Sequence, residues 1–208
     1  MIVFGPVPSR RLGQSLGINN IPPKTCSYSC VYCQIGRTTN MRINRSEFYE
    51  PSEIYLQVQS KVNQLQENGK QLDYISFVPD GEPTLDKNLG TELDLIKKLN
   101  ISTAVITNAS LLWMDEVKKD LAKADWVSVK IDAVWDDVWH RIDRPHGGLS
   151  LKNILDSMIA FSKSYRGHLV TETMLVSGFN DDLRHIEGIA EQISKINPRK
   201  SYLLVPTR

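Results

Sequence analysis

The sequence predicts an α/β fold with a parallel sheet, namely a partial (β/α)6 barrel of the TIM type. Strand-like and helix-like segments alternate along the chain, six strands with five helices, and such alternation requires parallel strands joined by right-handed crossovers. The chain has 208 residues, whereas a complete eight-stranded barrel takes about 250. We therefore expect residues 1–208 to form one domain with an incomplete barrel.

The individual elements follow from the spacing of apolar residues and from turn signals. Residues 15–20 alternate between polar and apolar positions, and two prolines follow shortly after them. This pattern indicates a first strand that runs into the cysteine-containing loop. Four apolar residues recur at helical spacing behind Pro51 and predict a helix over about 52–67. Further strands are expected at 73–78, 101–107, 126–131, 168–176 and 201–205, and further helices at 87–99, 112–123, 150–164 and 182–195.

Composition excludes several classes of protein. With 41% hydrophobic and 24% charged residues the chain is neither disordered nor a small disulfide scaffold. Lys and Arg number 25 against 24 Asp and Glu, so the protein has no net cationic field that would attract nucleic acid or anionic membrane. No apolar run reaches the roughly 18 residues of a membrane span, and the first residues do not resemble a signal peptide. We expect a cytoplasmic protein that does not contact membranes.

All three cysteines of the chain, Cys26, Cys30 and Cys33, fall within eight residues as C-x-x-x-C-x-x-C. An odd number of closely spaced thiols argues for a metal site or catalytic thiol chemistry rather than disulfides. Structural zinc requires four ligands, and the nearest histidine in sequence, His140, does not fit a zinc-finger spacing. A [4Fe-4S] cluster accepts cysteine thiolates, and three of them leave one iron without a protein ligand.

This spacing resembles that of the radical S-adenosylmethionine (radical SAM) enzymes. The resemblance implies that S-adenosyl-L-methionine chelates the open iron and is cleaved by one electron to a 5′-deoxyadenosyl radical, which takes a hydrogen atom from a substrate. It also implies an external one-electron donor of the flavodoxin or ferredoxin type. Tyr32 stands where the superfamily places a residue against the adenine; the alternative is a tyrosine that packs within the loop.

Functional residues of parallel α/β sheets lie at the carboxyl ends of the strands. After the second expected strand, residues 79–85 form a polar turn that resembles the G-G-E-P segment of the superfamily, which contacts the ammonium group of S-adenosylmethionine. The resemblance transfers this role to Gly81, Glu82 and Pro83, whereas Asp80 replaces the first glycine. Thr107 and Asn108 stand at the end of the third strand. They either contact the cofactor or form an ordinary turn.

Polar side chains also mark the fourth and fifth strands. Ser128, Lys130 and Asp132 share one face of their strand, because residues two apart point to the same side. Lys130 pairs either with the carboxylate of the cofactor or with Asp132 in a structural ion pair; Asp132 or Ser128 either bonds the ribose or holds Lys130. Glu172 lies within an apolar strand, so we expect it to face cofactor or substrate, or to be neutralised by Lys130.

The long connection 134–148 contains two tryptophans four residues apart, which indicate a short helix packed against the barrel. Arginines stand on both sides of the cysteines in sequence. They form either a patch for an anionic substrate or an ordinary mixed-charge surface: Arg10, Arg11, Arg37, Arg42 and Arg45.

Four segments extend the resemblance over nearly the whole chain, namely GPVPSRRLG, NNIPPKxCSYxCVYC, DGEPTL and ETMLVSGFND. They resemble a radical SAM group classed with the iron–sulfur oxidoreductases of tRNA wybutosine synthesis. Wyosine-forming enzymes carry further cysteines for a second cluster, so we do not predict their reaction. We expect the substrate to be a small molecule or an RNA. The sequence is also compatible with a natural protein that continues beyond Arg208. The alternatives are an iron–sulfur electron carrier or redox sensor and a zinc-containing RNA-binding module.

Overall fold

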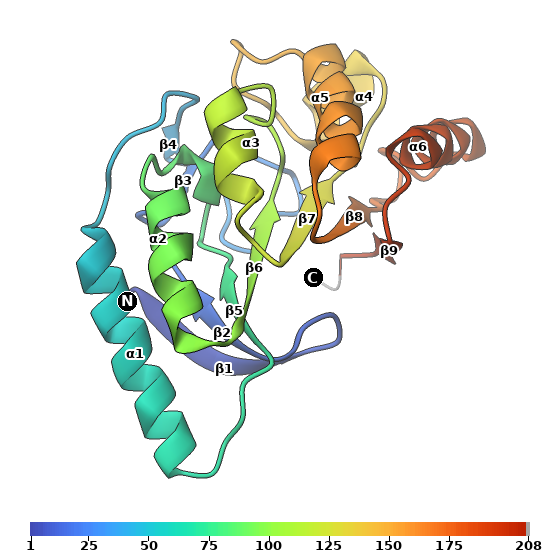
Figure 1. Ribbon diagram of the computed structural model, residues 1–208. Helices are drawn as coiled ribbons and strands as arrows, with labels where there is room; N and C mark the ends of the chain where they lie inside the picture. The colour runs from blue at the N-terminus through green and yellow to red at the C-terminus, as the bar shows by residue number, and fades with distance from the viewer. Residues whose placement is uncertain (207–208) are drawn as a thin grey trace.

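The computed structural model describes residues 1–206 and contains a curled seven-stranded sheet (Figure 1). In spatial order the strands are β1 (Val3–Ser9), β2 (Gly13–Ile18), β5 (Tyr74–Phe77), β6 (Ser102–Thr107), β7 (Trp126–Lys130), β8 (His168–Met174) and β9 (Lys200–Leu204). Neighbours from β2 to β9 are all parallel, whereas β1 is antiparallel to β2. Two short strands, β3 (Thr25–Cys26) and β4 (Asn40–Met41), pair separately. The main sheet is a half-barrel, which confirms the predicted fold class.

Helices connect the parallel strands and cover the outer face of the sheet (Figure 1). They are α1 (Pro51–Glu67), α2 (Leu89–Ile96), α3 (Asp115–Leu121), α4 (Asp136–Ile142), α5 (Leu151–Ser164) and α6 (Leu183–Ile196). In α1 the buried stripe is Ile54, Val58, Val62 and Leu65, and burial of such a stripe stabilises the helix on the sheet. No helix within residues 1–206 combines the length and the apolar character that a membrane crossing requires.

The six predicted parallel strands are all present, with bounds that differ by at most two residues from those expected. The largest helix differences are at α2 and α3. Helix α2 ends at Ile96 rather than at residue 99 because residues 97–99 form a 3-10 helix, and α3 begins at Asp115 rather than at residue 112 because residues 109–114 form turns. The short helix expected around the two tryptophans is α4, and Trp139 is buried in the core. Thr207 and Arg208, the last residues of the predicted domain, lie outside the described residues.

Strand β1 is absent from the elements that the sequence predicts. Pro6 and Pro8 interrupt it, and proline is disfavoured within a sheet because it lacks an N–H donor. An edge strand tolerates proline since one of its sides needs no partner. The register of β1 on β2 shifts between Phe4 and Val7. The hairpin that follows places residues 10–12 at the amino-terminal end of β2.

Two buried carboxyl groups, Asp86 and Glu92, lie beneath the segment that follows β5. Burial and then the nearby carboxylate of Asp86 raise the pKa of Glu92 to about 9. Burial also raises the pKa of Asp86 to about 6. Asn20 donates to Glu92 Oε2 (3.3 Å) and to the carbonyl of Pro83 (3.3 Å). At neutral pH the two carboxyls therefore hold one proton between them.

Replacing Glu92 by glutamine should remove most of the pH dependence of the free energy of unfolding that arises from Asp86 and Glu92. Between about pH 6 and 9 the folded pair retains a proton that the unfolded carboxyls have released. The free energy of unfolding of the wild type therefore falls as the pH rises, by up to about 1.4 kcal/mol per unit. Glu92→Gln has no such proton, and its amide can donate to Asp86 instead.

Thermal denaturation at about pH 6.5 and about pH 8.5 checks this prediction. The wild type should lose more Tm at the higher pH than Glu92→Gln does. Glu116→Gln, which replaces an exposed glutamate of α3, serves as the matched control and should follow the wild type. An equal loss in all three proteins would contradict a shared proton.

Candidate active site

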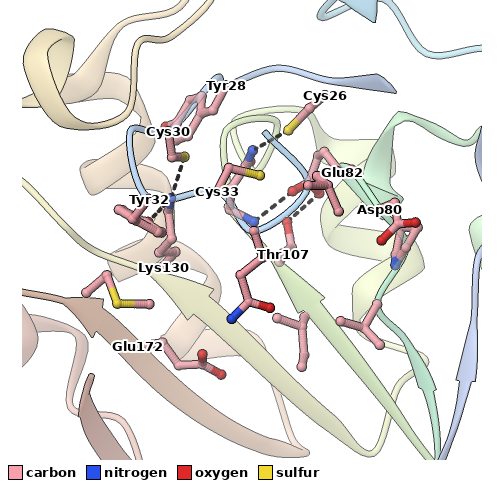
Figure 2. Close-up of a pocket in the computed structure, with 18 of the residues that line it drawn as sticks. Cys26, Tyr28, Cys30, Tyr32, Cys33, Asp80, Glu82, Thr107, Lys130 and Glu172 are labelled. Carbon is pink, nitrogen blue, oxygen red and sulfur yellow. Dashed lines mark hydrogen bonds between the residues drawn. The ribbon is translucent and has the colours of Figure 1, made fainter. Parts of the chain in front are cut away.

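A cavity of about 560 Å³ lies at the carboxyl ends of the parallel strands, beside the loop that carries the cysteines (Figure 2). Eleven of the thirteen side chains selected from the sequence line this first cavity: Cys26, Cys30, Tyr32, Cys33, Gly81, Glu82, Thr107, Asn108, Ser128, Lys130 and Glu172. The other two, Pro83 and Asp132, are buried next to lining residues. The fold thus brings together groups from five separate stretches of the chain.

The cysteine loop (residues 24–38) is held from both sides by backbone hydrogen bonds. On one side, the carbonyl of Asp80 accepts from the amide of Lys24 (2.7 Å). On the other side, the carbonyl of Asp143 accepts from the amide of Ser29 (3.0 Å). The loop is therefore fixed between the end of β5 and the end of α4, and the cysteines have a defined position over the strand ends.

Gly81 lets the segment after β5 approach the cysteine loop closely. A Cβ atom at this position would lie 2.0 Å from the carbonyl oxygen of Thr25. The amide of Glu82 donates to the same oxygen (3.1 Å). Any side chain at residue 81 would push the two segments apart, which is the physical reason for glycine in the G-E-P core.

Glu82 is buried, and its carboxylate ties the turn to the end of β6. Oε1 accepts from the amide and hydroxyl of Thr84 (3.1 and 2.6 Å) and from the hydroxyl of Thr107 (2.5 Å). Oε2 accepts from the amide of Asn108 (2.7 Å). Burial raises the pKa of Glu82, although these hydrogen bonds oppose the shift. Most of the acceptor capacity of this carboxylate is used within the protein.

Lys130 lies at the centre of a buried polar network, and Figure 2 shows it beside Cys30 and Tyr32. Its Nζ is 2.8 Å from Asp143 Oδ1, 3.2 Å from Asp132 Oδ2, 2.5 Å from the hydroxyl of Tyr32 and 3.0 Å from Cys30 Sγ. The Tyr32 hydroxyl in turn donates to Asp132. Burial alone would lower the pKa of Lys130, but the two carboxylates outweigh it and hold the pKa well above its usual value. The structural ion pair of Lys130 with Asp132, one of the two alternatives, is present.

The thiols of the cysteine loop need a cation to become thiolates. Burial, followed by the nearby Glu82, raises the pKa of Cys26 to about 12, and burial raises the pKa of Cys30 as well. Hydrogen-bond donors already face two sulfurs, since Asn108 Nδ2 lies 3.6 Å from Cys26 Sγ and Lys130 Nζ approaches Cys30. Such donors are typical partners of iron-bound cysteine sulfurs.

The donor set fits a cluster better than a single ion. Within residues 1–206 no three His, Cys, Asp or Glu side chains converge closely enough to hold one metal ion. A [4Fe-4S] cluster does not need such convergence, because each cysteine binds a different iron. Thiolate ligands also match the softness of iron–sulfur centres.

Glu172 faces the cavity but is not neutralised by Lys130. Its Oε1 accepts from the hydroxyl of Ser128 (2.7 Å), and its other oxygen pairs with Arg11 of the β1–β2 hairpin. The alternative in which Lys130 satisfies Glu172 is therefore wrong. Although Lys130 and Glu172 are register partners on the adjacent strands β7 and β8, two aspartates hold the ammonium group of Lys130 at the cysteine loop.

Comparison with known proteins identifies the family of this chain. A model of the Radical SAM superfamily matches residues 20–192, a range that includes the cysteine loop, the G-E-P turn and β5 to β8. The chain belongs to the radical SAM superfamily. A UPF0026 protein of Methanocaldococcus jannaschii is 49% identical over 207 residues, which cover 100% of this chain and 64% of that protein. The chain thus spans less than two thirds of the length of this curated relative.

Solved structures share the radical SAM fold with this chain at low sequence identity. A structure of TYW1 with a lysine-pyruvate adduct bound has a TM-score of 0.69 at 17% identity, covering 93% of this chain and 65% of that chain. A structure of anSMEcpe with bound AdoMet and a Cp18Cys peptide has a TM-score of 0.66 at 16% identity, covering 92% and 50%. At such identities the likeness shows the fold alone.

Three residues at or beside the first cavity have positions or contacts that the sequence does not predict. Asp143 pairs with Lys130, and Arg11 pairs with Glu172. Asp143 lies 13 residues after Lys130, beyond a turn and a helix, and Arg11 lies far from Glu172 in sequence, so strand and helix periodicity gives no signal for either pair. Asp80 lines the first cavity with an exposed side chain. The sequence feature that points to Asp80 is its replacement of the first glycine in the G-G-E-P pattern.

Proposed function

We propose that this protein is a radical SAM enzyme that cleaves S-adenosyl-L-methionine reductively and uses the resulting 5′-deoxyadenosyl radical to abstract hydrogen from a substrate. The observation that carries the proposal is the placement of Cys26, Cys30 and Cys33 beside the G-E-P turn at one cavity. Membership in the superfamily supports it. We also propose that residues 1–208 form a single radical SAM core domain.

In this proposal the three cysteines hold a [4Fe-4S] cluster and leave one iron without a protein ligand. When bound, the cluster supplies the electron that breaks a carbon–sulfur bond of S-adenosylmethionine. An external one-electron donor of the flavodoxin or ferredoxin type provides that electron. The buried charge of Lys130 lies against Cys30 and lowers the cost of negative charge on that sulfur.

The walls of the first cavity supply groups that orient S-adenosylmethionine. Tyr32 presents its ring for the adenine, while Asp132 fixes its hydroxyl. Thr107, Ser128 and Lys130 form the polar wall that we assign to the ribose and the carboxylate. Apolar lining residues exclude water from the place where a radical would form: Phe4, Ile106 and Met174.

We assign the ammonium group of S-adenosylmethionine to Asp80 and to the backbone of residues 81–83. The oxygens of Glu82 already accept four hydrogen bonds from the protein, so its carboxylate has little capacity for a further donor. Asp80 has a solvent-exposed side chain at the same cavity. Its amide donates to Asn19 Oδ1 (3.1 Å), which fixes its backbone.

Replacing Asp80 by asparagine should weaken the binding of S-adenosylmethionine about tenfold. A hydrogen bond to a charged group contributes about 1.5–3 kcal/mol, and the substitution removes the negative charge while keeping the shape. Equilibrium dialysis with the reconstituted protein measures the Kd directly. Asp137→Asn, which replaces an exposed aspartate of α4, is the matched control and should bind as the wild type does. An unchanged Kd for Asp80→Asn would remove Asp80 from the site.

The proposed function is tested by mass-spectrometric detection of 5′-deoxyadenosine. Protein reconstituted anaerobically with iron and sulfide, then reduced with dithionite, should form this product from S-adenosylmethionine, whereas protein without the cluster should not. Electron paramagnetic resonance of the reduced cluster, recorded with and without S-adenosylmethionine, reports binding at the open iron independently of turnover. A fully loaded protein that gives neither a product nor a spectral change would be an iron–sulfur electron carrier or redox sensor instead.

A further inference from the structure

A second cavity of about 540 Å³ lies inside the half-barrel, beside the β1–β2 hairpin. Its wall contains hairpin residues 7–12, positions of β2 and β5, and residues 202–204 of β9. Phe4, Val78 and Ile106 line both cavities, so the two cavities are neighbours. Sites for small molecules have volumes of roughly 300–1,000 Å³. The second cavity therefore has room for a ligand beside a cofactor in the first.

The boundary between the two cavities is apolar. The ring of Phe4 packs on Gly17 of β2, where a Cβ atom would come within 2.2 Å of Phe4 Cζ. Glycine at this position therefore fixes where the ring lies. Together with Val78 and Ile106, Phe4 forms a boundary that favours contact with a hydrocarbon part of a ligand.

Two arginines give the second cavity its charge. Arg10 lines it with an exposed side chain and forms no ion pair within residues 1–206. Arg11 lines it too, and its Nη1 pairs with Glu172 of the first cavity. Because Ser128 fixes Glu172 by a hydrogen bond of 2.7 Å, Arg11 is held at the side of the second cavity nearest to the cofactor site. A guanidinium has five N–H donors, which match a carboxylate or a phosphate.

The turn of the hairpin is ordered around these arginines. Ser9 Oγ accepts from the amides of Arg11 and Leu12 (3.2 Å each). Ser15 and Ser76 also line the cavity, and their hydroxyls, which are buried, bond to each other (2.8 Å). The arginines therefore stand on a fixed turn, and a bound anion would not have to order the backbone first.

We propose that the second cavity binds the anionic group, a carboxylate or a phosphate, of a small-molecule substrate. The hydrocarbon part of that substrate reaches past Phe4 to the first cavity. This inference rests on the proposed function, since it names the class of molecule from which the hydrogen atom is taken.

The arginines favour a small anion over an RNA. Recognition of an RNA needs basic residues spread over an exposed face. Arg45 is instead engaged by Asp120 (2.5 Å) with only 7% of its side chain exposed, and Arg42 bonds the carbonyl of Asn44 (2.9 Å) and Ser46. The formal net charge is only +1. Of the other three arginines that flank the cysteines in sequence, Arg37 is exposed, whereas Arg10 and Arg11 line a cavity rather than an extended surface.

Nuclear magnetic resonance tests the proposal without S-adenosylmethionine or turnover. The reconstituted, ¹⁵N-labelled protein is titrated with inorganic phosphate and, separately, with acetate. We expect saturable shifts of the amides of residues 9–12 and of the Nε–H signal of Arg10. A tighter response to phosphate assigns a phosphate substrate, and a tighter response to acetate assigns a carboxylate.

The variant Arg10→Gln should weaken the tighter-binding anion about tenfold, as expected for loss of a charge-assisted contact. Arg10 is exposed, so its replacement leaves the fold intact, which circular dichroism verifies. Arg166→Gln, an exposed arginine between α5 and β8, is the matched control and should bind as the wild type does.

Shifts elsewhere, or an affinity that Arg10→Gln does not change, would overturn the proposal. Binding of bulk tRNA that depends on Arg10, without a response to either small anion, would assign an RNA substrate instead. Failure here is distinguishable from failure of the proposed function. Formation of 5′-deoxyadenosine without anion binding rejects only the second cavity, and anion binding without 5′-deoxyadenosine rejects only the radical chemistry.

Discussion

Replacement of Cys30 by alanine should lower the formation of 5′-deoxyadenosine by more than about 100-fold. Loss of a partner that merely supports a metal ligand costs about 10–100-fold in metal affinity or activity, and Cys30 is itself one of the three thiol ligands that we propose. The substitution also leaves Lys130 and Asp143 without the sulfur that they contact. Mass spectrometry of the reduced protein with S-adenosylmethionine measures the product. Iron and sulfide analysis measures the cluster that remains.

The matched control for this experiment is Gln66→Ala. Gln66 is an exposed residue of α1 that does not line the first cavity. We expect Gln66→Ala to retain the cluster and a rate within about a factor of three of the wild type, since exposed substitutions away from special contacts have small effects. Product formation by Cys30→Ala at the control rate would refute the assignment of Cys30 as a cluster ligand.

Replacing Lys130 by methionine should destabilise the protein by about 3–5 kcal/mol. Methionine keeps the length of the side chain but removes the charge that pairs two aspartates. The side chains of Asp132 and Asp143 are only 0% and 3% exposed, so each would be left as an unpaired charge away from water. Urea denaturation under anaerobic conditions measures the loss in the free energy of unfolding.

Two further variants distinguish the effect of losing the buried charge from the effect of losing side-chain packing. In Lys130→Met combined with Asp143→Asn, one of the two unpaired carboxylates is gone, and we expect part of the lost stability to return. Lys152→Met breaks an exposed ion pair with Asp156, in which the lysine is 83% exposed, and should cost less than about 1 kcal/mol. If Lys130→Met costs no more than Lys152→Met, the buried network does not contribute as described.

The sequence predicts those parts of the site that depend on periodicity and on short motifs. Parallel strands expose their carboxyl ends on one edge, so Thr107 and Lys130 meet the cysteine loop once the strand order is known. The face shared by Ser128 and Lys130 follows from the two-residue repeat of a strand. Both expectations follow from neighbouring residues in the sequence, and the structure agrees with them.

Other features depend on long-range contacts, for which local rules give no signal. Asp143 follows a short helix and resembles any polar residue at a helix end, yet it reaches Lys130 and Cys30. Arg11 lies in a hairpin whose first strand contains two prolines, so neither the strand nor its ion pair with Glu172 is visible in the spacing. Only the folded chain shows that Asp143 contacts Lys130 and that Arg11 lines the second cavity.

The double attachment of the cysteine loop has a consequence for the biogenesis of this protein. The carbonyls of Asp80 and Asp143, which accept from the amides of the loop, are synthesised well after Cys33. While the ribosome extends the chain, the three thiols therefore have no fixed arrangement until α4 has emerged and packed. Under the proposed function, the cluster is therefore assembled on a chain that already extends past α4, and not on a nascent segment that ends near Cys33.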